Sequence, residues 1–247
     1  MNIAQIARQR LSNQGLLTAP FAAAEDVVAW LGAVQSQEYG LAKAAVAQRC
    51  TGITEADVDR AVADGVILRT HVLRPTWHFV QRDDIRWLLD LTAPRVQAMT
   101  EHRHRQLGID GTFLARGIAT IAAALADHTH LTRRELAAVL QRAGIRTDGQ
   151  ILPHLLMAAE LRAVICSGAP CGRHQTFALL HERAPDAAWL PRDEALGELA
   201  VRYFRSHGPA TRRDFQWWSS LTAADVRRGI EIAGAELESF DTGGRTY

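Results

Sequence analysis

The sequence predicts a mainly α-helical protein with small β-hairpins, an α+β fold built from tandem units. An internal repeat is the first reason: Thr-Arg-Arg followed by an acidic residue begins at Thr132 and again at Thr211, 79 residues later. The pattern around each copy is the second reason, since it reads as three helices and then two extended segments joined by a Gly-rich turn. That order is typical of a winged helix-turn-helix unit, so the predicted fold is a tandem of such units.

The first unit is expected to span residues 1–110. Thr54 with Asp57 three residues later is a helix-start signal, and Gly65 is a typical helix stop. The segment Val66–Val80 is rich in β-branched and aromatic residues and therefore predicts a hairpin. The expected helices, the last two of which link this unit to the next, are 3–14, 24–31, 41–49, 54–64, 82–91 and 94–106.

The second and third units are expected at residues 111–185 and 186–247. In each, a threonine is followed three residues later by an acid, Glu135 or Asp214, which is the pattern of a capping box. The chain ends three residues after Gly244, inside the last expected hairpin, so we expect a fragment or an early stop in this wing. The other helices of these units are expected at 113–127, 150–161, 194–204 and 222–233.

Composition excludes several classes of protein. With 28 basic and 27 acidic residues the net charge is +1, which leaves a DNA-binding face possible without requiring one. Lys43 is the only lysine; the arginine excess fits phosphate and guanine recognition, and equally the codon usage of a GC-rich genome. No run reaches the ~18–20 apolar residues of a membrane helix, and three widely spaced cysteines predict no disulfide framework, so we expect a cytoplasmic protein. The motifs of serine hydrolases, P-loop nucleotide hydrolases, dinucleotide enzymes and zincins are absent.

Two glutamines, Gln35 and Gln37, bracket the single small residue Ser36. In an extended backbone, residues two apart point the same way, so the two amides could converge on one spot. On a helix they would lie about 200° apart and could not cooperate. The alternative is that both glutamines cap the preceding helix or face water.

The expected hairpin holds a second concentration of polar side chains. A wing that carries arginine and histidine is suited to phosphate or groove contacts, whereas a tryptophan or histidine in a hairpin also packs commonly in a core. Both readings stay open. The candidate DNA-binding residues are six from the hairpin and the two arginines that begin the repeated helix: Arg69, Thr70, His71, Arg74, Trp77, His78, Arg133 and Arg212.

Two further groups favour structural roles. Cys166, Cys171 and His174 resemble a zinc site only loosely, and no fourth ligand is near in sequence, so no metal is expected. Trp217-Trp218 falls in the second helix of the third unit, where aromatic core packing is expected.

Three blocks of sequence, GAVQSQEYGLAKAAV, ILRTHVLRPTWHFV and HGPATRRDFQWWSSL, resemble the winged-helix DNA-binding family of the AlkZ-like (azinomycin-resistance) DNA glycosylases. The resemblance implies a monofunctional glycosylase that excises N-alkylated purines and unhooks interstrand crosslinks, with tandem winged helices arranged in a C-shaped molecule around DNA. The family's catalytic motif of two glutamines flanking one residue maps onto Gln35 and Gln37. A related branch has aspartate at the second position, so Gln37 indicates the crosslink-resistance branch. The expected partner is damaged double-stranded DNA bound by a monomer, with no cofactor.

The chemistry is reasonable without a carboxylate. An amide is a poor general base, but a purine alkylated at N7 carries a positive charge and leaves readily. Two amide oxygens could position water and stabilise the developing sugar cation. The alternatives are a non-catalytic winged-helix DNA-binding protein such as a transcriptional regulator, which would usually bind a palindrome as a dimer, and a scaffold protein that has lost DNA binding.

Overall fold

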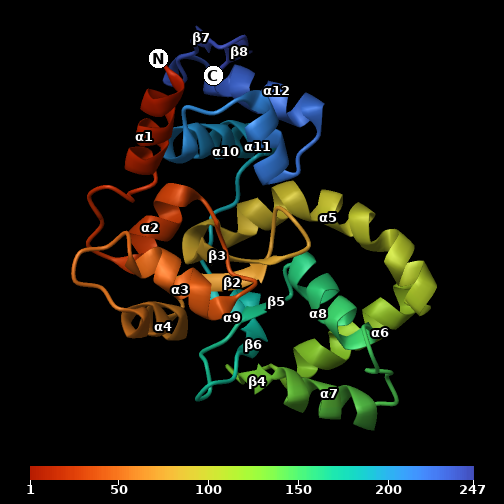
Figure 1. Ribbon diagram of the computed structural model, residues 1–247. Helices are drawn as coiled ribbons and strands as arrows, with labels where there is room; N and C mark the ends of the chain where they lie inside the picture. The colour runs from red at the N-terminus through yellow and green to blue at the C-terminus, as the bar shows by residue number, and fades with distance from the viewer.

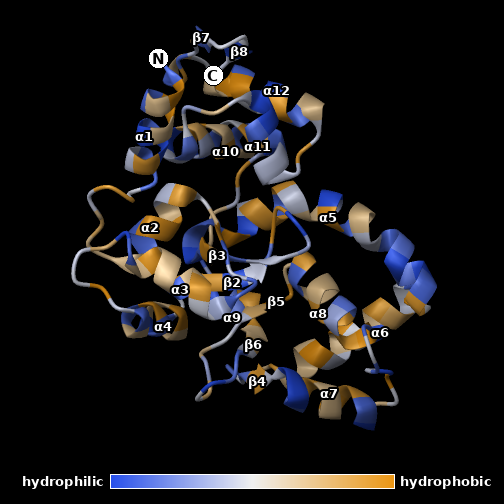
Figure 2. Cartoon of the chain, in the orientation of Figure 1, coloured by the Kyte–Doolittle hydropathy of each residue, from blue (hydrophilic) through white to orange (hydrophobic).

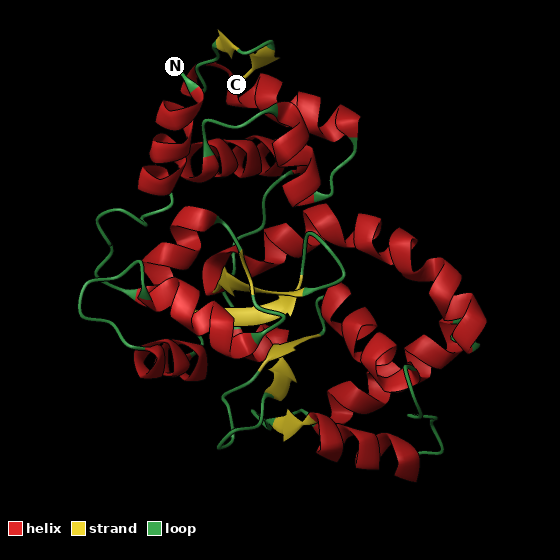
Figure 3. Ribbon diagram, in the orientation of Figure 1, coloured by secondary structure: helices red, strands yellow, loops and turns green.

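The computed structural model describes residues 1–247 and is mostly helical, with three small antiparallel sheets (Figures 1 and 3). The strand orders are β1-β3-β2, β4-β6-β5 and β7-β8. The predicted α+β class, with helices predominating over short hairpins, is confirmed.

The first unit follows one order of elements that recurs later in the chain. Its bounds are α2 (Ala24–Leu31), β1 (Val34–Gln35), α3 (Tyr39–Ala47), α4 (Glu55–Asp64), β2 (Ile67–His71) and β3 (Trp77–Gln81). Thr54 and Asp57 form the expected capping box, and Gly65 ends α4 at φ 78°, a backbone angle that a glycine adopts without strain. The predicted hairpin is confirmed, and β1 adds a third strand beside β3.

A single long helix, α5 (Ile85–Leu107), connects the first unit to the second after a short 3-10 turn, η1 (Arg82–Asp84). The predicted break between two helices was wrong, because Pro94 lies inside α5. Proline removes the bond to the carbonyl four residues earlier, which belongs to Asp90. Both residues are exposed, so water can bind that carbonyl and the helix continues.

The second unit repeats the order of the first. It comprises α6 (Gly111–Ala124), β4 (Leu131–Thr132), α7 (Arg133–Arg142), α8 (Ile151–Leu161), β5 (Ile165–Ser167), β6 (Thr176–Leu179) and the short α9 (Leu180–Arg183). The capping box of Thr132 and Glu135 begins α7, as predicted. The strand order β4-β6-β5 matches β1-β3-β2, so the two units share both element order and sheet topology.

The third unit has helices in the same order but a smaller sheet. It comprises α10 (Arg192–His207), α11 (Arg212–Ser219), α12 (Ala223–Ala233), η2 (Gly234–Glu236), β7 (Asp241–Thr242) and β8 (Arg245–Thr246). Thr211 and Asp214 form the second predicted capping box. The helix α1 (Ile3–Asn13) lies beside α10 (Figure 1), where Arg10 Nε donates to the Pro209 carbonyl at 2.7 Å.

The interior is divided into several cores. The sheet of the first unit lies between two of them. Leu68 and Val80 pack into a core of 24 buried residues shared with α5, the third unit and part of the second unit, and Ile67 and Phe79 pack into a core of 12 under α2–α4. The second unit has its own core of 16 residues. Figure 2 shows that the last turns of α5, which lie beyond the shared core, are hydrophilic.

No single helix is both long and apolar enough to cross a membrane; Arg82–Leu107 and Gly111–Ala124 reach those limits only as a pair, which is bent by 102°.

Candidate active site

Gln35 and Gln37 lie where β1 leaves the first sheet. Gln35 pairs in register with His78 of β3, and the Ser36 N–H donates to the Trp77 carbonyl at 2.7 Å. Both glutamine side chains are exposed, whereas Ser36 is fully buried. This alternation is that of an extended chain, so the two amides stand on the side opposite Ser36. The segment is not part of a helix, which is the condition under which two glutamines at this spacing can act on one spot.

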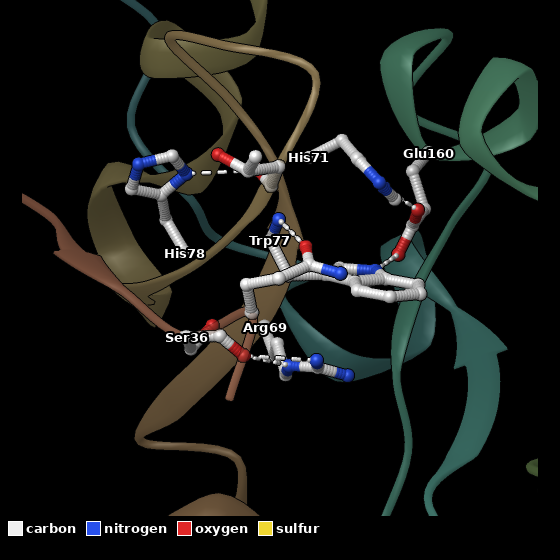
Figure 4. A network of polar contacts seen from close by, with 8 residues as sticks. Ser36, Arg69, His71, Trp77, His78 and Glu160 are labelled. Atoms are coloured by element: carbon white, nitrogen blue, oxygen red, sulfur yellow. Dashed lines mark hydrogen bonds and ion pairs between the residues drawn. The ribbon is translucent and has the colours of Figure 1, made fainter. Parts of the chain in front are cut away.

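The strand ends at this point because side chains take over its hydrogen bonds. In a regular ladder the Ser36 carbonyl would accept from the Trp77 N–H. The carbonyl instead accepts from Nε and Nη2 of Arg69, at 3.1 and 2.9 Å (Figure 4). The Trp77 N–H donates to Oε1 of Gln37 at 3.4 Å. The amide of Gln37 is therefore oriented by the sheet, and its oxygen keeps a second lone pair for another donor.

The guanidinium of Arg69 is stacked between aromatic rings. Its Cζ lies 4.3 Å from the ring centre of Trp77 and 5.8 Å from that of Tyr39. Burial lowers the pKa of Arg69, and the negative charge of Glu160 opposes the shift. An arginine stays protonated in such surroundings, so a buried positive charge lies directly beneath Ser36.

Glu160 belongs to α8 of the second unit and is only 1% exposed. Its Oε1 accepts from Trp77 Nε1 at 3.2 Å, and its Oε2 contacts His71 Nδ1 (Figure 4). Sequence analysis missed this residue. The signal was present, since Glu160 is the only acidic residue in a helix that is otherwise apolar except for His154.

The opposite face of the same sheet carries His78, beside Gln35 on one strand and Thr70 on the other. His78 is 2% exposed, and burial lowers its pKa to about 4. Its Nδ1 is 2.9 Å from the Thr76 carbonyl, the arrangement of a neutral imidazole that donates one bond. The uncharged imidazole ring of His78 therefore lies beside Gln35 at physiological pH.

The turn of the first hairpin meets the third unit at Arg74, whose Cζ lies 4.7 Å from the ring centre of Trp217. Trp217 is 72% exposed, so the prediction that it packs in a core was wrong. The prediction is confirmed for Trp218, which packs against the shared core. Adjacent helical residues point about 100° apart, so only one of the pair can face inward.

The eight residues predicted to bind DNA fall into three groups. Four of them, Arg69, Thr70, His71 and His78, are at most 9% exposed, so they have little surface to offer a phosphate. Arg74 and Trp77 are half-buried beside them. Arg133 and Arg212 are exposed and begin α7 and α11, which lie in the lower and upper parts of Figure 1 and do not join the cluster.

The cysteines do not form a cluster. Cys166 is fully buried, and burial raises the pKa of its thiol to about 12, whereas Cys171 is exposed. His174 meets Cys171 through backbone hydrogen bonds of the hairpin. No group of three or more histidine, cysteine or acidic side chains is arranged to hold a metal ion.

Comparison with known proteins places the chain among the DNA glycosylases. A family model described as "DNA glycosylase AlkZ-like" matches residues 28–247, and the chain therefore belongs to the AlkZ-like DNA glycosylase family. It is 28% identical over 251 residues to an interstrand DNA cross-link repair glycosylase of Streptomyces sahachiroi, a match that covers 98% of this chain and 67% of that protein.

The fold is also similar to a solved structure, that of the DNA glycosylase AlkZ of Streptomyces sahachiroi. The TM-score is 0.79 at 28% sequence identity, over 96% of this chain and 66% of that chain. This chain therefore spans about two thirds of the length of the relatives that it matches.

Proposed function

We propose that the protein is a monofunctional DNA glycosylase that hydrolyses the N-glycosidic bond of purines alkylated at N7 or N3. The observation that carries the proposal is the exposed pair Gln35 and Gln37, set in extended backbone with Ser36 buried between them. Membership of a DNA glycosylase family supports it. The relative's name refers to interstrand cross-link repair, and we extend that substrate class to this chain.

The reaction needs little from the protein because the substrate is activated. Alkylation at N7 gives the purine a positive charge, so the base departs without prior protonation and leaves an oxocarbenium-like sugar. The amide oxygens of Gln35 and Gln37 offset this charge and orient the attacking water. The free lone pair of Gln37 Oε1 accepts from that water while Trp77 holds the amide in place. An undamaged purine lacks the charge and stays bonded.

The repeated element order supports three winged-helix units, at residues 1–110, 111–185 and 186–247. Arg133 and Arg212 are the first residues of equivalent helices, in positions suited to phosphate contacts along double-stranded DNA. Tandem, non-identical units favour wrapping by a monomer over a dimer on a palindrome. The three unpaired cysteines agree with a reducing compartment, and we place the protein in the cytoplasm.

The test is release of 7-methylguanine from a duplex under single-turnover conditions. We expect Gln35→Ala and Gln37→Ala each to lower the excision rate by ~10²–10³-fold, the usual effect of removing one preorganised dipole. The dissociation constant for DNA should not change, because neither residue is charged. Gln9→Ala is the matched control, since Gln9 is an exposed glutamine on α1.

Two results would contradict this mechanism. Full excision by the double variant Gln35→Ala, Gln37→Ala would exclude the amides. Glu38 is the exposed carboxylate next in sequence, and loss of excision on Glu38→Gln with retention in both glutamine variants would assign the water to a carboxylate base. A parent protein that binds the duplex and releases no base would favour the alternative, a non-catalytic DNA-binding protein.

A further inference from the structure

The glutamine segment is connected by a chain of contacts to the second unit. We propose that Glu160 is a positioning residue for the reaction: through Trp77 it supports Arg69, and Arg69 holds the backbone between the two glutamines. The inference rests on the proposed glycosylase function and names a residue outside the unit that carries the glutamines.

The first step is the contact of Arg69 with Ser36. Two nitrogens of one guanidinium donate to the same carbonyl oxygen, which fixes the peptide plane joining Ser36 to Gln37. The side chain of Ser36 adds no restraint of its own, because its buried Oγ has no hydrogen-bond partner. The bond from Trp77 to the Gln37 amide is long, at 3.4 Å. Arg69 therefore restrains the backbone between the two amides, together with the bond from the Ser36 N–H to the Trp77 carbonyl at 2.7 Å.

The second step is the support of Arg69. The ring of Trp77 lies 4.3 Å from the guanidinium carbon, close enough for a cation–π contact that keeps the plane in place. The backbone N–H of Arg69 donates to Ser167 Oγ of β5 at 2.8 Å, so the second unit also holds the start of this side chain. A shift of the Trp77 ring would release the guanidinium from its position under Ser36.

The third step is the support of Trp77 by Glu160. Each carboxylate oxygen meets one ring of the first unit, Trp77 on Oε1 and His71 on Oε2, and the two rings lie 4.6 Å apart. A carboxylate buried to this degree contributes little net stability, because its desolvation opposes the gain from its partners. The role of Glu160 is to orient the Trp77 ring. Its negative charge also offsets the positive charge of Arg69, which would otherwise disfavour a sugar cation nearby.

The experiment compares three variants in the full chain: Glu160→Ala, Glu160→Gln and Arg69→Lys. We expect Glu160→Ala and Arg69→Lys to slow single-turnover excision of 7-methylguanine by ~10²-fold, the size expected when reacting groups shift by about 1 Å. Lysine retains the charge but lacks the planar fork that grips one carbonyl and stacks on a ring. The dissociation constant for DNA should stay within about twofold, because both side chains are buried.

Glu160→Gln is the conservative rescue. Its amide oxygen can still accept from Trp77 Nε1, so we expect the rate to recover to within about threefold of the parent. The indole N–H signal of Trp77 in a ¹H–¹⁵N spectrum, assigned with Trp77→Phe, reports the contact independently of activity. That signal should shift in Glu160→Ala and stay near its parental position in Glu160→Gln.

Arg183→Lys is the matched control. Arg183 is a half-buried arginine that donates to two backbone carbonyls of the first unit, those of Val62 and Ala63 at 2.7 and 3.0 Å, and it does not touch the glutamine segment. Its variant should excise at the parental rate. Parental rates in both Glu160→Ala and Arg69→Lys would overturn the positioning role alone, as would a Glu160→Gln variant no faster than Glu160→Ala. A parent that releases no base would refute the proposed function, and the positioning role with it.

Discussion

Gly229 of α12 faces α10 at a point where the two helices lie close together. A Cβ atom at this position would lie 2.6 Å from the Leu196 carbonyl oxygen and 3.2 Å from its carbonyl carbon. Glycine in a helix interior normally costs about 0.5–1 kcal/mol relative to alanine, so an unobstructed Gly→Ala change would stabilise the protein. Here the obstacle is backbone, which cannot rotate away, and overpacking costs about 1–3 kcal/mol. We expect Gly229→Ala to lower the free energy of unfolding by about 1–2 kcal/mol.

The assay for this prediction is urea unfolding followed by circular dichroism. Gly111→Ala is the control, because Gly111 is in the first turn of α6 and a Cβ there meets nothing within 4 Å. Its free energy of unfolding should rise by up to about 1 kcal/mol, since alanine restricts the unfolded chain. An equal rise in the free energy of unfolding of Gly229→Ala and Gly111→Ala would show that α12 can pack against α10 without a glycine at this position.

Three other predictions concern buried charge, protons and thiols. Burial lowers the pKa of His78 to about 4, so as the pH falls from about 6.5 to 4 the unfolded state takes up the proton before the folded state does. We therefore expect the free energy of unfolding to fall by about 3 kcal/mol over that range of pH. Urea unfolding at a series of pH values should show a smaller loss for His78→Gln. Asp84 is 6% exposed, accepts from the Trp87 indole and pairs with Arg202. Because Asp84→Asn removes the negative partner of Arg202, it should lower the free energy of unfolding by about 3 kcal/mol and reduce the thermal midpoint. An unchanged midpoint would contradict this. A thiol reagent should label one cysteine in the native protein, Cys171, and all three after denaturation. Fast labelling of a second thiol in the native protein would contradict the burial of Cys50 and Cys166.

Features governed by neighbouring residues could be predicted from the sequence. The helix starts at Thr54, Thr132 and Thr211 depend on an acid three residues later, and all three capping boxes are present. The extended backbone at Gln35 and Gln37 was only a condition for their cooperation, and it is the pairing of β1 with β3 that produces it. The break expected at Pro94 failed because the cost of a proline depends on whether water reaches the freed carbonyl, which the local sequence does not state.

The rest of the site depends on contacts between distant segments. Glu160 meets Trp77 from a helix in another unit, and no local pattern specifies which first-unit ring an isolated acid in an apolar helix will meet. Trp217 and Trp218 are identical in type and adjacent in sequence, so only the rotation of α11 decides which of them is exposed. The buried positions of Arg69 and His71 likewise follow from a sheet enclosed on both faces, which composition alone does not reveal.

The second unit has a core of 16 residues of its own and contributes only Cys166, Leu180 and Ala184 to the core that the glutamine-bearing sheet shares with α5 and the third unit. Separately packed regions exchange their amide hydrogens through separate openings, each with its own free energy. An opening confined to the second unit would withdraw Glu160 from Trp77 while Gln35 and Gln37 stay in folded surroundings. On gradual heating, excision should therefore cease at a lower temperature than the one at which circular dichroism records the loss of the remaining helices. The interval between these two temperatures would measure how much less stable the second unit is than the rest of the protein.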